Sequence, residues 1–206
     1  VHKLFDTDLV LISPRSKSSI SMSGFPRRRL IQARASKDVI GTTAVNWNFL
    51  LWRNPKTLST RSILALGFEP NDPLLLDPGF LPKAKSLTNR GRVLFDVLSR
   101  DEFGPINEWF NEKRIIETEV AGKRVRVSGL VELGPSFGAD GNLITSRETY
   151  LRLLPSNPPG SIEIGLIRLS SSANPKYVAK KLSSSLPNDV KVLTKREFIE
   201  FEKNYW

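Results

Sequence analysis

The glycine-rich stretch GPSFGADGN, residues 134–142, comes closest in this sequence to a catalytic motif. Its first five residues spell G-x-S-x-G, the pattern that places a nucleophilic serine on the elbow of a hydrolase. Such a serine needs a base, and in hydrolases of this type the histidine follows the serine in the chain. The single histidine is His2, which precedes Ser136, and ADGN predicts a turn where the elbow requires a helix. We therefore do not expect Ser136 to act as a nucleophile.

Metal and nucleotide chemistry also lack the residues that they need. The sequence has no cysteine and one histidine, which excludes zinc sites of ordinary composition. Glu117 and Glu119 alternate on a predicted strand, and cross-strand pairing with Lys123, Arg124 and Arg126 explains them more simply than a metal. Neither G-x-G-x-x-G nor G-x-x-x-x-G-K-[ST] occurs. We expect no enzymatic activity, no metal and no cofactor.

The composition is that of a folded protein with a basic surface. The 206 residues are 39% hydrophobic and 25% charged, and the net charge is +10. Residues 1–70 hold 11 Lys/Arg against 4 Asp/Glu, residues 71–155 hold 12 against 12, and residues 156–206 hold 8 against 5. The two ends share a basic character that the middle lacks, which suggests an insertion. A basic surface serves nucleic acid, anionic lipid or an acidic partner, or is simply solvated.

The elements expected from the residue pattern give the same division. The ends predict β-α-β-β and then β-α-β, with a final helix after a Thr194–Glu197 capping box. The middle predicts strands and a short helix that follows a Thr145–Glu148 capping box. We therefore predict an α+β protein in which residues 1–70 and 156–206 form one α+β lobe and residues 71–155 an inserted, mostly β lobe. The expected segments are strands at 8–13, 45–51, 61–68, 92–97, 115–120, 124–133, 161–169 and 190–193, and helices at 27–35 and after Asn174.

Nucleic-acid binding is the less favoured use of the basic residues Arg27, Arg28 and Arg29. Stacking of bases needs aromatic rings interleaved with exposed basic side chains. The aromatic residues fall at core-facing positions, except Phe25, Trp52 and Phe137, which we expect outside the core. We therefore expect no nucleic acid as partner.

Three long segments carry a resemblance to a known family: residues 8–33, residues 136–146 and residues 189–206. Together they closely resemble the permease of cyanobacterial ABC exporters of the DevC type, in the wider MacB/FtsX/LolC class. The likeness runs over nearly the whole chain. It implies a domain between the first and second transmembrane helices, on the periplasmic side of the plasma membrane. Because the chain begins with Val1 and stops at Tyr205-Trp206 within an apolar pattern, we expect a piece of a longer protein.

The resemblance implies a porter lobe built from both chain ends and an inserted "sabre" lobe. It further implies mechanotransmission, in which a separate ABC ATPase subunit moves the periplasmic domains of a dimeric permease. The implied partners are a HlyD-like adaptor and, through it, a TolC-like channel, and the implied cargo is glycolipid. The chain departs from the whole family in lacking the transmembrane helices and the ATPase, so it cannot transport alone. A lipid- or substrate-binding module is the alternative function.

Two segments are the candidate functional sites. In the loop, glycines and Pro135 would hold Phe137 out on a stiff tip, so Ser136, Phe137, Asp140 and Asn142 are expected to bind a partner. The alternative is that Phe137 folds back onto the inserted lobe.

At the chain end, Phe198, Phe201 and Tyr205 form one stripe, and Tyr and Trp favour a membrane interface. We expect Phe201, Tyr205 and Trp206 to belong to a membrane-proximal stalk. A terminal helix packed on the core is the competing view.

Overall fold

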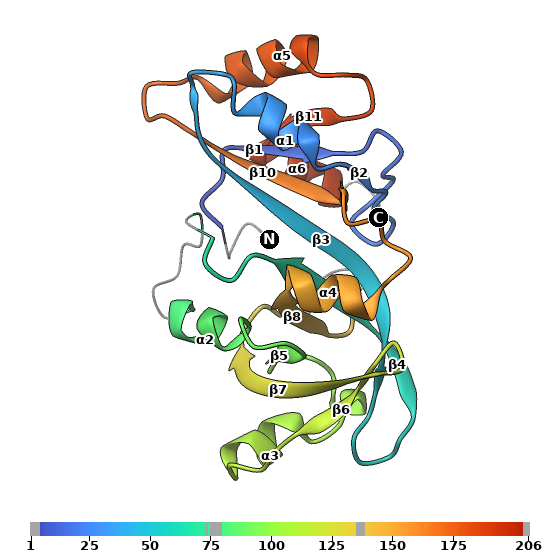
Figure 1. Ribbon diagram of the computed structural model, residues 1–206. Coiled ribbons are helices and arrows are strands. Elements are labelled where there is room, and N and C mark those ends of the chain that lie inside the picture. Colours follow the sequence, from blue (N-terminus) through green and yellow to red (C-terminus); the bar gives the residue numbers. More distant parts are fainter. Residues whose placement is uncertain (1–4, 73, 75–79, 135–138, 204–206) are drawn as a thin grey trace. The chain divides into compact units, whose positions relative to one another are not determined.

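The computed structural model describes residues 5–72, 74, 80–134 and 139–203, and it shows a mixed α+β protein (Figure 1). Within these ranges nine strands follow the order β11-β1-β10-β3-β4-β8-β5-β7-β6, and β2 pairs with β9. The chain divides into two compact units. We call Val1–Asn46, Asp72–Asp77 and Pro159–Trp206 the terminal unit, and Trp47–Asn71 and Pro78–Pro158 the inserted unit.

The terminal unit is built on antiparallel strands with β1 between β10 and β11. All four residues of β1 are buried, as expected for a strand that is covered on both faces. The first part of β3 pairs with the other side of β10. The elements of this unit are β1 (Leu9–Ile12), β2 (Phe25–Pro26), α1 (Arg28–Ala33), β3 (Val39–Arg53, shared), β9 (Ser161–Ile162), β10 (Ile164–Leu169), α5 (Pro175–Ser185), β11 (Lys191–Thr194) and α6 (Lys195–Lys203).

Helices cover both faces of this antiparallel layer. Leu9 and Leu11 pack in one core with Leu30 of α1 and Leu182 of α5. A Cβ added at Gly165 would lie 2.8 Å from Leu30 Cδ2, so α1 approaches β10 as closely as a glycine allows. Helix α6 contacts β1 and β11 and lies against the opposite face (Figure 1).

The inserted unit has a sheet that closes on itself. Strands β4 and β8 pair in parallel, as do β5 and β7, whereas β5 and β8 pair antiparallel. Trp52 of β3 pairs with Val120 of β6, so the strand order returns to β3. The further elements are β4 (Thr60–Phe68), α2 (Leu81–Ser86), β5 (Arg92–Asp96), a 3₁₀-helix (Asp101–Phe103), α3 (Ile106–Asn111), β6 (Glu117–Val120), β7 (Lys123–Val131), β8 (Asn142–Ser146) and α4 (Arg147–Leu153).

Aromatic residues fill the centre of this unit. Trp52 is fully buried, its ring centroid lies 5.3 Å from that of Phe95, and its indole N–H donates to the carbonyl of Phe103 at 2.9 Å. Tyr150 of α4 covers Gly67 of β4, where an added Cβ would lie 2.5 Å from Tyr150 Cβ. Helix α4 is thus fixed by a close approach to the sheet that a larger residue would prevent.

Local signals in the sequence are confirmed where they are strongest. Asn174 caps α5 by accepting from the backbone N–H groups of Lys176 and Tyr177. Ala121 and Gly122 have φ values of 50° and 71° and form the predicted hairpin turn. Glu117 and Glu119 stand opposite Arg126 and Arg124 in the strand register, and Glu119 forms its ion pair with Arg53 of β3 at 3.1 Å.

Other expectations differ from the structure. The cap of α4 is Ser146, which accepts from the N–H of Thr149, and not Thr145, which lies in β8 and donates to the carbonyl of Arg92. Residues 47–70, expected with the chain ends, belong to the inserted unit because β4 pairs with β8 over its whole second half.

No helix in the described part of the chain is long and apolar enough to span a bilayer.

Candidate functional site

The base of the loop at 134–142 is organised by Asp96, a fully buried carboxylate at the end of β5. Its Oδ1 accepts from the backbone N–H groups of Leu98 and Leu133 at 3.2 and 3.0 Å. Its Oδ2 accepts from the N–H of Gly134 at 3.1 Å and from the side-chain amide of Asn142 at 2.7 Å. Both oxygens are therefore satisfied, as a buried carboxylate requires.

Asn142 ties the two ends of the loop together. Its side-chain amide also donates to the carbonyl of Gly134 at 2.9 Å, and its backbone N–H donates to Ser99 Oγ at 3.2 Å. Because the side chain is 4% exposed, these bonds lie out of water and hold the residues that flank 135–138 in a fixed relation.

Asp140 anchors the same loop through ion pairs. Its carboxylate lies 2.5 Å from Arg61 Nη2 and 3.0 Å from Arg100 Nε. The pKa of Asp140 lies below its ordinary value, chiefly because Arg61 donates a hydrogen bond to it and further because Arg100 carries a nearby positive charge. Arg61 also stacks on the ring of Phe103, with 5.7 Å from its Cζ to the ring centroid.

The four predicted partner-binding residues differ in burial and in whether the structure describes them. Ser136 and Phe137 lie outside the described residues. Asn142 is buried, and Asp140 is part-buried and ion-paired, so these two residues hold the base of the loop. Sequence reasoning missed Asp96, although an acid that closes the apolar strand RVLFD was a usable signal, because a buried carboxylate needs partners.

The three basic residues at α1 do not share one role. Arg27 and Arg28 are exposed, whereas Arg29 is 7% exposed and forms a bidentate pair with Asp189. Its Nε lies 2.8 Å from Oδ1, and its Nη2 lies 2.6 Å from Oδ2. Arg29 donates a hydrogen bond to this carboxylate, which lowers the pKa of Asp189. Arg29 therefore links α1 to the segment before β11.

Replacing Asp189 by Asn is expected to destabilise the protein at neutral pH. A folded-state pKa below the ordinary value of about 3.9 means that the pair stabilises above that pH and that this stabilisation is lost as pH falls through the folded pKa. Urea unfolding between pH 7 and pH 3 should show curves for wild type and Asp189→Asn that converge at the acid end. Asp38→Asn is the control, since Asp38 lies 3.9 Å from Lys181 and should matter less. Parallel curves would contradict this role.

The structure buries two aromatic residues that nucleic-acid binding would need on the surface. Phe25 and Trp52, which were expected outside the core, are 2% and 0% exposed. Phe25 packs with the helices of the terminal unit, and Trp52 packs in the inserted unit. With Arg29 paired as well, the described residues offer no stacking platform beside the arginines.

Helix α6 begins with the predicted capping box. Glu197 accepts from the N–H and the hydroxyl of Thr194, and the N–H of Glu197 donates to Thr194 Oγ1. The backbone N–H of Thr194 is the main reason why the pKa of Glu197 lies below its ordinary value. Phe198 is buried and stacks on half-buried Phe201, with 6.1 Å between centroids. Tyr205 and Trp206 lie outside the described residues.

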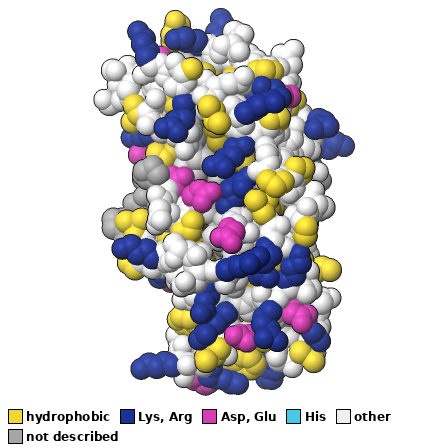
Figure 2. All heavy atoms as spheres, viewed as in Figure 1, with side chains coloured by type: hydrophobic (Ala, Val, Ile, Leu, Met, Phe, Trp, Pro, Cys, Tyr) yellow, Lys and Arg dark blue, Asp and Glu magenta, His cyan; other side chains and the backbone are white. Residues whose placement is uncertain are grey.

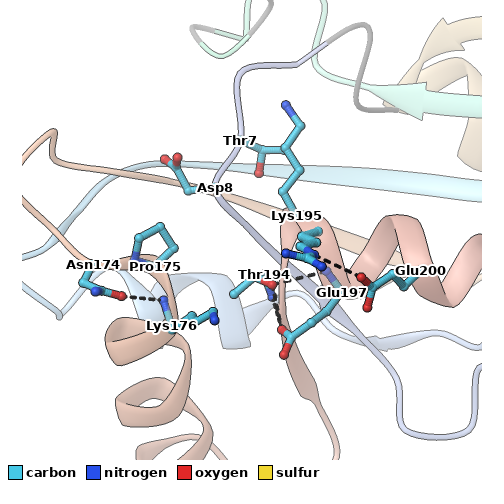
Figure 3. A pocket seen from close by; sticks show the side chains of 10 residues that line it. Thr7, Asp8, Asn174, Pro175, Lys176, Thr194, Lys195, Glu197 and Glu200 are labelled. Carbon is cyan, nitrogen blue, oxygen red and sulfur yellow. Dashed lines mark hydrogen bonds and ion pairs between the residues drawn. The ribbon is translucent and has the colours of Figure 1, made fainter.

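A hollow of about 770 Å³ lies between the first turns of α5 and α6 (Figure 3). Figure 3 shows Asn174 and Thr194 turned toward their own helices, where both act as caps. The hollow is lined by three basic and three acidic residues, so its charges are balanced by its own residues: Lys176, Lys195 and Arg196 against Asp8, Glu197 and Glu200. In the described ranges no group of three or more metal-ligating side chains occurs.

No family model and no curated protein matches the sequence. Solved structures do match. The periplasmic region of MacB from Actinobacillus actinomycetemcomitans has a TM-score of 0.60 at 11% identity and covers 98% of this chain and 95% of that one. The extracellular domain of YknZ, a noncanonic ABC-type transporter from Gram-positive bacteria, has a TM-score of 0.54 at 11% identity over 91% and 100%. The chain therefore has the fold of the periplasmic region of MacB and of the extracellular domain of YknZ.

Proposed function

We propose that this chain is the periplasmic domain of an ABC-exporter permease and that it transmits ATP-driven movement. The ATPase is a separate subunit in the cytoplasm, the intact permease is a dimer in the plasma membrane, and the domain contacts a HlyD-like adaptor that leads to a TolC-like channel. Glycolipid is the proposed cargo. The chain itself carries out no reaction in this scheme.

The fold likeness is the observation that supports this proposal most. It extends over at least 91% of this chain and at least 95% of each of the two solved domains, so it concerns whole domains. YknZ is named as an ABC-type transporter, and the two solved domains are named as a periplasmic region and an extracellular domain. The resemblance of residues 8–33, 136–146 and 189–206 to DevC-type permeases supports the same conclusion from the sequence.

The loop at 134–142 is the proposed adaptor-contacting segment. Asp96, Asn142 and Asp140 fix its flanks, and a fixed base reduces the entropy that a contact at the tip would cost. In a pull-down with the adaptor encoded beside the permease, Phe137→Ala should reduce capture. Tyr177→Ala is the matched control, because Tyr177 is 67% exposed on α5 and lies outside the loop. Equal capture by both variants would count against the loop.

The mechanical role is proposed for α6 and its continuation into the second transmembrane helix. Inserting four glycines after Lys203 of the full-length permease should abolish export while ATP binding and folding survive, because glycine softens a helix. Four alanines at the same place are the control, since they add the same length and keep the helix stiff. Export that is unchanged by the glycine insertion would refute the mechanical role.

A further inference from the structure

The terminal unit has a groove of about 630 Å³ beside α1 that the proposed function does not use. Its lining comes from α1, from the entry to that helix and from the first part of β3. The backbone N–H of Arg27 donates to the carbonyl of Gly160 at 2.8 Å and fixes one wall. The lining residues are Pro26, Arg27, Arg28, Leu30, Ile31, Arg34, Thr42, Ala44 and Gly160.

The floor of the groove is apolar. Leu30 and Ala44 belong to the core of the terminal unit and are 4% and 6% exposed. Ile31 of α1 also lines the groove and is 70% exposed. Apolar surface thus continues from the buried floor to water.

The rim of the groove is cationic. Arg27, Ile31 and Arg34 are spaced i, i+4 and i+7, which places them on one side of the helical turn. Arg27, Arg28 and Arg34 are exposed, and none of the three forms an ion pair within 4.0 Å with a described residue. Figure 2 shows Lys and Arg side chains among hydrophobic ones on the face that carries α1.

Among the described residues, none that lines the groove is acidic. This distinguishes it from the hollow between α5 and α6, which is lined by Asp8, Glu197 and Glu200. It also distinguishes its three arginines from Arg29, whose charge is met by Asp189. The positive charge of Arg28 contributes to the low pKa of Asp189, so Arg28 interacts with this carboxylate at a distance. The charges of Arg27 and Arg34 are met by no ion pair with a described residue. A desolvated anion would find strong donors here.

We infer that this groove binds a single-chain anionic amphiphile, a molecule with a carboxylate or phosphate head and an alkyl chain. The head would be held by Arg27 and Arg34, and the chain would lie on Leu30, Ala44 and Ile31. The volume lies within the range of about 300–1,000 Å³ typical of small-molecule sites. None of the described residues that line the groove is aromatic, which disfavours a single-stranded nucleic acid. The inference goes beyond the proposed function and does not depend on it.

Matched soluble probes test the ligand class on the 206-residue chain. Decanoate, below the concentration at which it forms micelles, is titrated by calorimetry and by backbone amide NMR, with decanol and acetate as probes that lack the charge or the chain. Decanoate should bind at least tenfold more tightly than either and should shift the amides of residues 27–34 and 40–44. Equal binding of acetate would reduce the site to an anion-attracting surface, and equal binding of decanol would reduce it to an apolar patch; each result overturns the inference.

Variants locate the site. Arg27→Ala combined with Arg34→Ala should weaken decanoate binding at least tenfold, and Thr42→Phe, which fills the groove, at least fivefold. The matched controls are Arg15→Ala combined with Lys17→Ala, which removes the same charge from exposed positions, and Thr60→Phe at the exposed first residue of β4. Both controls should stay within twofold of wild type. Loss in the controls as large as in the groove variants would overturn the assignment.

Vesicles separate a groove from a membrane-binding face. Vesicles of phosphatidylglycerol are compared with monomeric decanoate on the same chain. Competition of decanoate with vesicle binding, abolished by Thr42→Phe, would support the groove. Binding to vesicles without any binding of monomeric decanoate would overturn the inference in favour of a membrane-binding surface.

Discussion

Replacing Asp96 by Asn is expected to lower the free energy of unfolding by about 2–4 kcal/mol, because each buried donor left without an acceptor costs about 1–3 kcal/mol. Each carboxylate oxygen of Asp96 accepts two hydrogen bonds. An asparagine replaces one of those oxygens by an amino group, and that group would face two donors. Urea unfolding of wild type and Asp96→Asn measures the loss.

Hydrogen exchange gives a local measurement of the same change. The N–H groups of Leu133 and Gly134 should exchange faster in Asp96→Asn, since both donate to the carboxylate. Asp101→Asn is the control, because Asp101 is exposed at the start of the 3₁₀-helix. A change in stability no larger than that of Asp101→Asn would show that Asp96 does not organise the loop.

The outcome would also separate two roles of the loop residues. Asn142 donates to the same oxygen as the Gly134 N–H, so Asn142→Ala should act on stability together with Asp96→Asn and not in addition to it. We propose that substitutions at Asp140 or Asn142 reduce adaptor capture through the shape of the loop. Phe137→Ala would instead reduce capture without loss of stability.

Sequence alone predicted the elements whose signals are local. The Asn174 cap, the Thr194–Glu197 box and the Ala121-Gly122 turn each depend on a few neighbouring residues, and the structure shows all three. Helices α2 and α3 were not predicted, because each has only six residues and no side-chain N-cap to mark its start. Helix α1 is equally short but lies within the predicted helix 27–35. The α+β class was predicted correctly, since it needs only the types of element and their order.

In the long strand β3, the two-residue alternation of the sequence does not predict which side chains are buried. Alternation from Val45 through Trp47 to Leu51 predicted one continuous buried face. The structure buries Val45 and Trp47 but then changes face, so that Leu51 is 57% exposed and Trp52 is fully buried. The change falls where β3 passes from the terminal to the inserted unit. Each half is buried against different strands, and a sequence pattern does not contain its partners.

Pairs distant in sequence could not be predicted at all. Arg29 and Asp189 are 160 positions apart, and Arg61 and Asp140 are 79 apart. A single sequence does not show which distant residues are in contact, so Arg29 was assigned to an exposed basic cluster with Arg27 and Arg28. The structure instead buries Arg29 against Asp189, in the segment before β11.

Replacing Trp52 by Ala is expected to cost about 3–5 kcal/mol, the usual range for a fully buried tryptophan. The indole packs on Phe95, its N–H donates to the carbonyl of Phe103, and its backbone lies where β3 meets β6. Trp52→Phe should cost less, since a ring remains and mainly the hydrogen bond to Phe103 is lost, at about 1–3 kcal/mol for the unsatisfied carbonyl. Chemical unfolding of the two variants measures both values.

Trp109→Ala is the matched control, because Trp109 is half-buried and stacks with the guanidinium of Arg114 at 4.1 Å. A cation–π contact at such a site contributes about 0.5–1 kcal/mol. Hydrogen exchange in Trp52→Ala should show lost protection in β4, β5, β7 and β8 before β1 and β10. That order follows if the inserted unit carries its own core, since Trp52 contributes to that core alone. Simultaneous loss in both groups of strands would show that the two units unfold as one, with β3 as the strand that joins them.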